Sequence, residues 1–408
     1  MDYNSALSKL EKYGQQHILK FYNELSELQK KELLEQIEET DFDIIEASRR
    51  ETKIATKGVI TPLSAMQLDE IEKRRDEFYK IGMDAIKKGQ VGAVLLAGGM
   101  GTRLGSDNPK GMYNIGINKD VYIFQRIVEN LMDIVNKSGV YIHLFVMTSE
   151  KNNDITIEFF EKMNYFGYDR EYISFFKQEM APATDYNGKV FMEEKYKIAT
   201  SPNGNGGWFS SILRSHVIDI INKNNIEWLN VFSVDNVLQR IADPVFVGAT
   251  IATNSKVGSK VVRKAFRDEK VGVMCLEDGK PSIVEYYELT EKMLDAVNEQ
   301  GEPAYNYGVI LNYLLNVSEL MNIAKKQMPL HIVEKKIKYI DENGNEVSPE
   351  EPNGYKYETL ILDMIHLMET CLPFEVVRNK EFAPIKNKTG VDSVDTARQL
   401  LKENGIEL

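Results

Sequence analysis

A short apolar run that ends in a glycine-rich turn constrains the fold of this chain more than any other feature. Residues 91–97 are almost continuously apolar, which is typical of a strand buried on both faces of a parallel sheet. Three glycines follow within residues 98–101, and they let backbone N–H groups approach a negatively charged ligand closely. Because Arg103 and Lys110 come next, the turn predicts a phosphate-binding loop.

The spacing of this turn excludes the two commonest nucleotide loops. A dinucleotide fingerprint requires a glycine three residues after Gly101, whereas Gly105 comes one residue later. A P-loop requires Gly-Lys-Ser/Thr, but Ser106 and Asp107 follow Gly105. Alternatively, the glycine-rich stretch is an ordinary turn between a strand and a helix, which binds no ligand and carries two solvated cations.

Composition excludes several classes of partner. The chain has 408 residues and a net charge of −12, which argues against a nucleic-acid-binding surface. No apolar run approaches the ~18 residues of a membrane helix, and the start MDYNSALSKLEKYG has no apolar core of a secretory signal. Cys275 and Cys371 stand alone, so neither a disulfide framework nor a zinc site is expected. We therefore expect a cytoplasmic protein without nucleic-acid or membrane partners, whose oligomeric state the sequence does not reveal.

Strand and helix patterns alternate after residue 88. Apolar strands are predicted at 91–97, 140–148, 172–176 and 229–234, with helices around 123–134, 155–163 and 209–221 and a hairpin joining 271–276 to 282–286. This alternation predicts an α/β fold whose ligands lie beyond the carboxyl ends of the strands.

Three consecutive regions are expected along the chain. Apolar residues at near-helical spacing predict an N-terminal helical region at 1–88. The alternating part, at 89–330, is the expected catalytic domain, and 331–408 is the expected small C-terminal α+β region, reached through a polar loop at 338–357.

The stretch 95–116 resembles the nucleotide loop of the UDP-sugar pyrophosphorylases, L-x-G-G-x-G-T-R-L-G-x-x-x-P-K. Its continuation GMYNIG at 111–116 is similar to the N-acetylglucosamine branch of that family. Similar blocks recur in order over nearly the whole chain: GQQHIL at 14–19, FFKQEM at 175–180, SPNGNGG at 201–207, VDN at 234–236, VEY at 284–286, NYG at 306–308, KKI at 335–337 and FAPIKN at 382–387. The resemblance implies a Rossmann-like nucleotidyltransferase domain with a mixed, mainly parallel sheet.

The activity that the resemblance implies is transfer of a uridylyl group from UTP to a sugar 1-phosphate, with pyrophosphate leaving and Mg²⁺ assisting. Such a transfer needs positioning and charge neutralisation but no protein nucleophile. Arg103 and Lys110 suit the leaving phosphates, and the carboxylate of Asp235 suits Mg²⁺, although by itself Asp235 is equally well read as a helix cap. Lys386, in isolation a surface lysine, is expected by resemblance to reach the phosphates through closure of the C-terminal region.

The remaining matched positions are recognition groups in this family. By resemblance, the uridine nucleotide contacts Leu96, Ala97, Gly98, Gly99, Gln178, Gly204 and Lys336, and the sugar phosphate contacts Asn205, Glu285, Tyr286, Asn306 and Lys356. Neighbouring Lys335 leaves open which of the two adjacent lysines faces the phosphates.

The block around Asn205 bears on the sugar. Glucose-type relatives usually carry a histidine where this chain has Asn205, so the sequence favours N-acetylglucosamine 1-phosphate, with N-acetylgalactosamine 1-phosphate as a further candidate. The nearer alternative is the same reaction on glucose or galactose 1-phosphate. A remoter one is a UDP-sugar sensor without catalysis, which would not need the basic residues of a pyrophosphate clamp.

Overall fold

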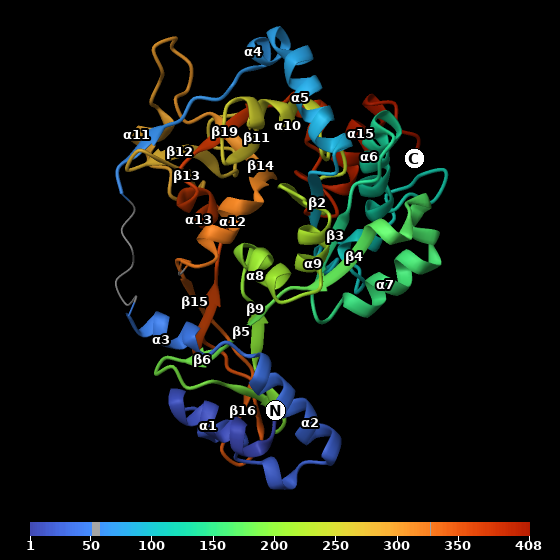
Figure 1. Ribbon diagram of the computed structural model, residues 1–408. Coiled ribbons are helices and arrows are strands. Elements are labelled where there is room, and N and C mark those ends of the chain that lie inside the picture. Colours follow the sequence, from blue (N-terminus) through green and yellow to red (C-terminus); the bar gives the residue numbers. More distant parts are fainter. Residues whose placement is uncertain (51–57, 327) are drawn as a thin grey trace. The chain divides into compact units, whose positions relative to one another are not determined.

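Figure 1 shows the computed structural model, which describes residues 1–50, 58–326 and 328–408. The chain forms two compact units: unit 1 comprises Met1–Thr56, Glu179–Gly207 and Met328–Ile361, and unit 2 comprises Lys57–Gln178, Trp208–Gln327 and Leu362–Leu408. This division differs from the three consecutive regions expected from the sequence. The reason is that each unit joins segments that are far apart in the chain.

Unit 2 is built on a ten-stranded mixed sheet in which the path β1-β12-β14-β10-β2-β3-β4 carries β11, β13 and β19 as additional strands. The strands β10, β2, β3 and β4 are parallel neighbours, whereas β14 is antiparallel to both β10 and β11. The mixed α/β fold is confirmed, with a larger antiparallel share than the sequence predicted, because β12 and β13 form a hairpin and β14 is antiparallel to β10, β11 and β12. The bounds are β1 (Ile60–Pro62), β2 (Val91–Leu96), β3 (Leu144–Thr148), β4 (Ile173–Lys177), β10 (Trp228–Ser233), β11 (Val257–Arg263), β12 (Val273–Glu277), β13 (Lys280–Val284), β14 (Tyr307–Asn316) and β19 (Cys371–Glu375).

Helix α6 covers the parallel part of this sheet with one apolar face. Ile123, Ile127 and Leu131 are fully buried and Ile134 is 6% exposed, which confirms the predicted helical spacing. Full burial of each such side chain contributes about 1.5–3 kcal/mol. The helices of unit 2 are α4 (Leu68–Lys73), α5 (Arg75–Lys87), α6 (Ile123–Ser138), α7 (Asn153–Lys162), α8 (Trp208–Leu213), α9 (Val217–Lys223), α10 (Pro244–Ala252), α11 (Glu291–Leu294), α12 (Val317–Ile323), α14 (Arg378–Glu381) and α15 (Val394–Glu403), while α13 (Ile361–Leu367) begins at the last residue of unit 1.

Unit 1 has its own core, in which the N-terminal helices pack on the second chain segment. Leu10, Leu33 and Ile37 are fully buried, and they pack in one core with the buried Met192 and Ile198. The predicted amphipathic helices before the α/β part are confirmed as α1 (Tyr3–Tyr13), α2 (Glu27–Glu39) and α3 (Asp43–Arg50). The strands of unit 1 are β5 (Met180–Pro182), β6 (Thr184–Asp185), β7 (Met192–Glu194), β8 (Lys197–Ile198), β9 (Thr200–Pro202), β15 (His331–Lys335), β16 (Tyr339–Ile340), β17 (Glu346–Val347) and β18 (Gly354–Glu358).

Two predicted elements differ from the structure. The single helix expected at 209–221 is interrupted between α8 and α9, where the Ser215 hydroxyl accepts a hydrogen bond from the backbone N–H of Val217, the first residue of α9. The loop expected at 338–357 contains the hairpin of β16 and β17 and most of β18. These strands are short and mostly not fully buried, so they lack the apolar alternation that would identify them.

Candidate active site

Three of the predicted ligand-binding segments leave the sheet of unit 2 at one edge. Ser233 of β10 pairs with Leu96 of β2, and Leu96 in turn pairs with Met147 of β3, whose neighbour Thr148 pairs with Lys177 of β4. Because these strands are parallel, the residues that follow them emerge side by side. The glycine turn, the segment around Asp235 and Gln178 therefore meet at the carboxyl ends of the strands, where the sequence predicted ligands.

Backbone hydrogen bonds close the glycine loop on itself. The N–H of Gly101 donates to the carbonyl oxygen of Asn108 at 2.8 Å, and the N–H of Lys110 donates to that of Gly99 at 3.1 Å. A Cβ on Gly98 would lie 2.8 Å from Oε1 of Gln178, whereas a Cβ on Gly99 would meet no atom within 4 Å. Gly98 thus makes room for the Gln178 amide, and Gly99 leaves the exposed backbone open to a ligand.

Lys110 forms the central ion pair of this edge. Its Nζ lies 2.6 Å from Oδ1 of Asp235, and the two side chains are 13% and 30% exposed. Lys110 lies in the short helix η4 (Lys110–Met112), and the preceding helix η3 (Thr102–Leu104) carries Arg103. Arg103 is exposed and has no ion-pair partner in the described part of the chain, so its guanidinium is available to an anion. The predicted basic residues and the predicted acidic residue thus lie on adjacent segments.

Asp235 does not cap a helix. It lies in a turn after β10, and its own N–H is held by the Ser233 hydroxyl at 3.2 Å. The next helix, α10, has Asp243 as its N-cap, whose carboxylate accepts from the N–H of Val245. Of the two alternatives for Asp235, the structure excludes the helix cap and leaves a partly exposed carboxylate at the edge of the sheet.

The segment before Lys386 is attached directly to the Asp235 turn. The N–H of Ile385 donates to the carbonyl oxygen of Asp235 at 2.9 Å, and Asn236 forms an antiparallel bridge with Pro384. Ile385 is fully buried. Lys386 therefore belongs to the same compact unit as the glycine loop, in contrast to the separate closing region expected from the sequence. Its Nζ is held 3.1 Å from Oδ2 of Asp392.

The predicted sugar contacts of unit 2 lie around one position of β12. Val273 pairs with Val284 on one side and with Gly308 on the other, which brings Glu285 and Asn306 close to the same point. The amide oxygen of Asn306 accepts from the N–H of Lys264 at 3.2 Å, and burial lowers the pKa of the Lys264 ammonium. Tyr286 is 44% exposed, so its ring is accessible.

Gly204 and Asn205 belong to unit 1. Gly204 has φ +86°, and a Cβ there would lie 2.3 Å from the carbonyl oxygen of Thr359, so the position requires glycine. The Asn205 amide oxygen accepts from the N–H of Ile361 at 3.0 Å, which leaves its NH₂ group to donate elsewhere. These residues start helix η7 (Asn205–Gly207).

Strand pairing in unit 1 distinguishes the two adjacent lysines. Val333 pairs with Lys356 and Lys335 pairs with Gly354, so Lys335 and Lys356 project from the same face of the sheet of β15, β18 and β6. Lys336 follows the end of β15 and is exposed. The face shared with Lys356 favours Lys335 over the predicted Lys336 as its partner.

Two buried asparagines support this edge and were not singled out from the sequence. Asn152 is fully buried, and its amide donates to the carbonyl oxygen of Ala97 at 3.0 Å, which fixes the end of β2. Asn236 accepts from the N–H of Ala383 at 2.9 Å and donates to the carbonyl oxygen of Glu381 at 2.7 Å. The position of Asn236 next to Asp235 could have indicated a supporting role at the site. Nothing in the local sequence indicates such a role for Asn152.

Asp235 is the only protein ligand that we assign to a metal ion at this site. Within residues 1–50, 58–326 and 328–408, no three His, Cys, Asp or Glu side chains are arranged to hold a metal ion. A divalent cation at Asp235 would thus need phosphate oxygens or water as further ligands. In the same described ranges, no helix has the length and apolar character needed to cross a membrane.

Comparison with known proteins identifies the family. Residues 36–403 match the profile of UTP–glucose-1-phosphate uridylyltransferase. The chain belongs to this family. A human relative, UDP-N-acetylhexosamine pyrophosphorylase-like protein 1, is 34% identical over 97% of the chain and 83% of its own length. The UDP-N-acetylglucosamine pyrophosphorylase of Saccharomyces cerevisiae is 34% identical over 94% of the chain and 86% of its own length.

Solved structures of the family agree with this assignment. The uridine diphosphate N-acetylglucosamine pyrophosphorylase of Trypanosoma brucei superposes with a TM-score of 0.83 at 27% identity, covering 98% of this chain and 84% of its own. A UDP-glucose phosphorylase from the same organism reaches a TM-score of 0.67 at 17% identity, which shows a shared fold. This member of the family is a uridylyltransferase that acts on UTP and a sugar 1-phosphate.

Proposed function

We propose that this uridylyltransferase converts UTP and N-acetylglucosamine 1-phosphate into UDP-N-acetylglucosamine and pyrophosphate, and that N-acetylgalactosamine 1-phosphate is a second substrate. The observation that carries the choice of sugar is the similarity of 34% over nearly the whole chain to relatives named for N-acetylhexosamine and N-acetylglucosamine. Asn205, where glucose-type relatives usually carry histidine, supports the same choice.

The reaction is a direct displacement. A phosphate oxygen of the sugar 1-phosphate attacks the α-phosphorus of UTP, the bond to the bridging oxygen breaks, and pyrophosphate leaves with the bonding electrons. The work of the protein is to position two polyanions and to neutralise the charge that develops on the leaving group. In this proposal Arg103 and Lys110 contact the departing phosphates, and Lys386 contacts the phosphates from the neighbouring segment.

The 2.6 Å contact between Lys110 and Asp235 supports this assignment of roles. A lysine that leaves its carboxylate partner for an incoming polyanion also frees that carboxylate for a divalent cation. Asp235 fits Mg²⁺, because Mg²⁺ is usually held by one or two carboxylates together with substrate phosphates and water. When bound, Mg²⁺ would neutralise phosphate charge.

The recognition groups complete the proposal. The backbone from Leu96 to Gly99, with Gln178 and Gly204, would contact the uridine, since an amide side chain offers both a donor and an acceptor to the uracil edge. Asn205, Glu285, Tyr286 and Asn306 would contact the sugar. Lys356 and one of the two adjacent lysines, Lys335 or Lys336, would lie near phosphate.

A pyrophosphate-release assay with UTP and a panel of sugar 1-phosphates tests the function. We expect N-acetylglucosamine 1-phosphate to have a higher kcat/KM than glucose 1-phosphate, because polar groups that pair with an acetamido group are left unsatisfied without it. Equal or better turnover of glucose 1-phosphate would overturn the assignment of the sugar and leave uridylyl transfer intact. Turnover of none of the sugars would contradict the proposal as a whole.

A further inference from the structure

A cavity of unit 2 is lined by residues other than the predicted active-site residues. It has a volume of about 530 Å³ and lies among α5, α6 and the segment that leads into α10. None of the residues predicted to bind UTP or the sugar lines it. Its walls carry the apolar residues Ile134, Leu238, Ile241 and Val245 together with the exposed ring of Tyr79. A volume of this size accommodates a small metabolite.

The charges around this cavity do not cancel. Five cations line it against three carboxylates, although the whole chain has a net charge of −12. Each carboxylate already has a cationic partner. Asp133 pairs with Lys137 at 2.6 Å, Glu129 pairs with Arg126, and Asp243 pairs with the buried Lys260 at 3.2 Å. Lys260 also lies 2.5 Å from Glu381, so Asp243 shares this buried cation with a second carboxylate.

Two of the cations have no carboxylate within ion-pair distance in the described part of the chain. They are the exposed Arg240 and Lys380, whereas Arg75 pairs with Glu72. The charge of Arg240 also acts on the buried carboxyl groups of Asp243 and Glu381. A third observation comes from Arg126, whose side chain is only 8% exposed and whose Nε has no hydrogen-bond partner within the described residues. A buried guanidinium N–H without an acceptor, in a cavity that two further cations line, favours negative charge there.

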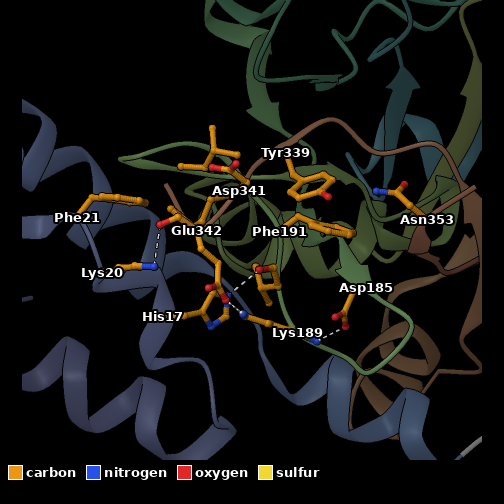
Figure 2. Close-up of a pocket in the computed structure, with 13 residues that line it drawn as sticks. His17, Lys20, Phe21, Asp185, Lys189, Phe191, Tyr339, Asp341, Glu342 and Asn353 are labelled. Carbon is orange, nitrogen blue, oxygen red and sulfur yellow. Dashed lines mark hydrogen bonds and ion pairs between the residues drawn. The ribbon is translucent and has the colours of Figure 1, made fainter. Parts of the chain in front are cut away.

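A cavity of unit 1 differs in its charges, because its lysines have acceptors within the protein. Figure 2 shows Lys20, Lys189 and Glu342 beside the rings of Phe21, Phe191 and Tyr339. Lys20 donates to the carbonyl oxygen of Glu342 at 2.7 Å, and Lys189 pairs with the Glu342 carboxylate at 3.8 Å. Both lysines have acceptors within the protein, so that cavity carries no comparable demand for an anion.

We propose that the cavity between α5, α6 and α10 is a binding site for a small molecule that carries a phosphate group. Arg240 and Lys380 bind the phosphate, because a guanidinium fork and an ammonium together match its oxygens. Tyr79 and the apolar wall accept the organic part of the ligand. The site is separate from the one at the ends of β2 and β10, and the proposal does not depend on which sugar the enzyme uses.

Equilibrium dialysis with radiolabelled inorganic phosphate and glycerol 3-phosphate tests the proposal on the full chain. We compare the unaltered protein with Arg240→Glu/Lys380→Glu, with Lys110→Ala to weaken the catalytic site, and with Lys87→Glu/Lys88→Glu. The last variant is the matched control, because it makes the same change of net charge at two exposed lysines outside the cavity. A thermal unfolding curve of each variant checks that it is folded.

We expect one class of binding to persist in Lys110→Ala and in the control, and to weaken by ~10-fold or more in Arg240→Glu/Lys380→Glu. Tighter binding of glycerol 3-phosphate than of phosphate supports a phosphate ester as the ligand, and equal binding of the two overturns the role of Tyr79 and the apolar wall. Binding that Arg240→Glu/Lys380→Glu leaves unchanged, or no binding of either probe in Lys110→Ala, overturns the proposal.

Discussion

Replacement of Lys110 by alanine separates its role in the fold from its role in catalysis. In the resting protein this lysine pairs with Asp235 at 2.6 Å, and the Asp235 side chain is 30% exposed. Water can therefore solvate the carboxylate when the lysine is removed. Loss of such a partly exposed pair costs about 1 kcal/mol or less of the free energy of unfolding. For a chain of this size that lowers Tm by no more than ~4 °C.

The expected effect on the reaction is much larger. If Lys110 neutralises charge on the departing pyrophosphate, its loss removes an electrostatic contact that is strongest in the transition state. One contact of this kind contributes ~10²-fold or more to the rate, about 2.7 kcal/mol. We therefore expect kcat of Lys110→Ala to fall by at least that factor, while KM for UTP changes less.

The assay is pyrophosphate release at saturating UTP and sugar 1-phosphate, together with a thermal unfolding curve. Lys256→Ala is the matched control, because Lys256 also pairs with a carboxylate, Glu319, at 2.5 Å and is partly exposed. It should show a similar small loss of stability with normal turnover. A kcat for Lys110→Ala within about threefold of the unaltered enzyme would refute the role of this lysine in the reaction.

Three further predictions concern the metal, the glycine loop and pH. Asp235→Asn should need a much higher Mg²⁺ concentration for pyrophosphate release, while its Tm falls by no more than ~4 °C because the same ion pair with Lys110 is lost. An unaltered Mg²⁺ titration would show that Asp235 is not a ligand. Gly99→Ala should keep its Tm, since a Cβ there meets no atom within 4 Å, but should raise KM for UTP by ~10-fold or more; normal KM would mean that the backbone of Gly99 does not approach the nucleotide closely. Burial lowers the pKa of His17 from its usual 6.5, so its neutral form stabilises the fold fully above that pH and progressively less below it. The free energy of unfolding should thus fall between about pH 7 and pH 5, and it should fall less steeply in His17→Gln. Denaturant titrations at several pH values measure this free energy, and the same decrease with pH in both proteins would contradict the prediction.

Local sequence determined the parts of the site that depend on neighbouring residues. Residues 91–110 contain the six buried residues of β2, the glycine-rich turn after it, and the cations Arg103 and Lys110. The periodic apolar face of α6 and the strand before Asp235 were predictable for the same reason. A helix or strand that is buried on one face or on both has a periodic pattern of apolar residues. This pattern can be recognised without knowing which distant residues pack against it.

Only the tertiary structure decided which distant side chains meet. Lys110 and Asp235 are 125 residues apart, and their contact depends on β10 pairing with β2 in a particular register. The attachment of the Lys386 segment to the Asp235 turn and the support of β2 by Asn152 depend on hydrogen bonds between segments that carry no shared sequence pattern. The three-segment composition of unit 1 has the same origin. Side-chain periodicity is a local property, whereas strand order and hydrogen bonding across a core are set by how the whole chain buries its apolar surface.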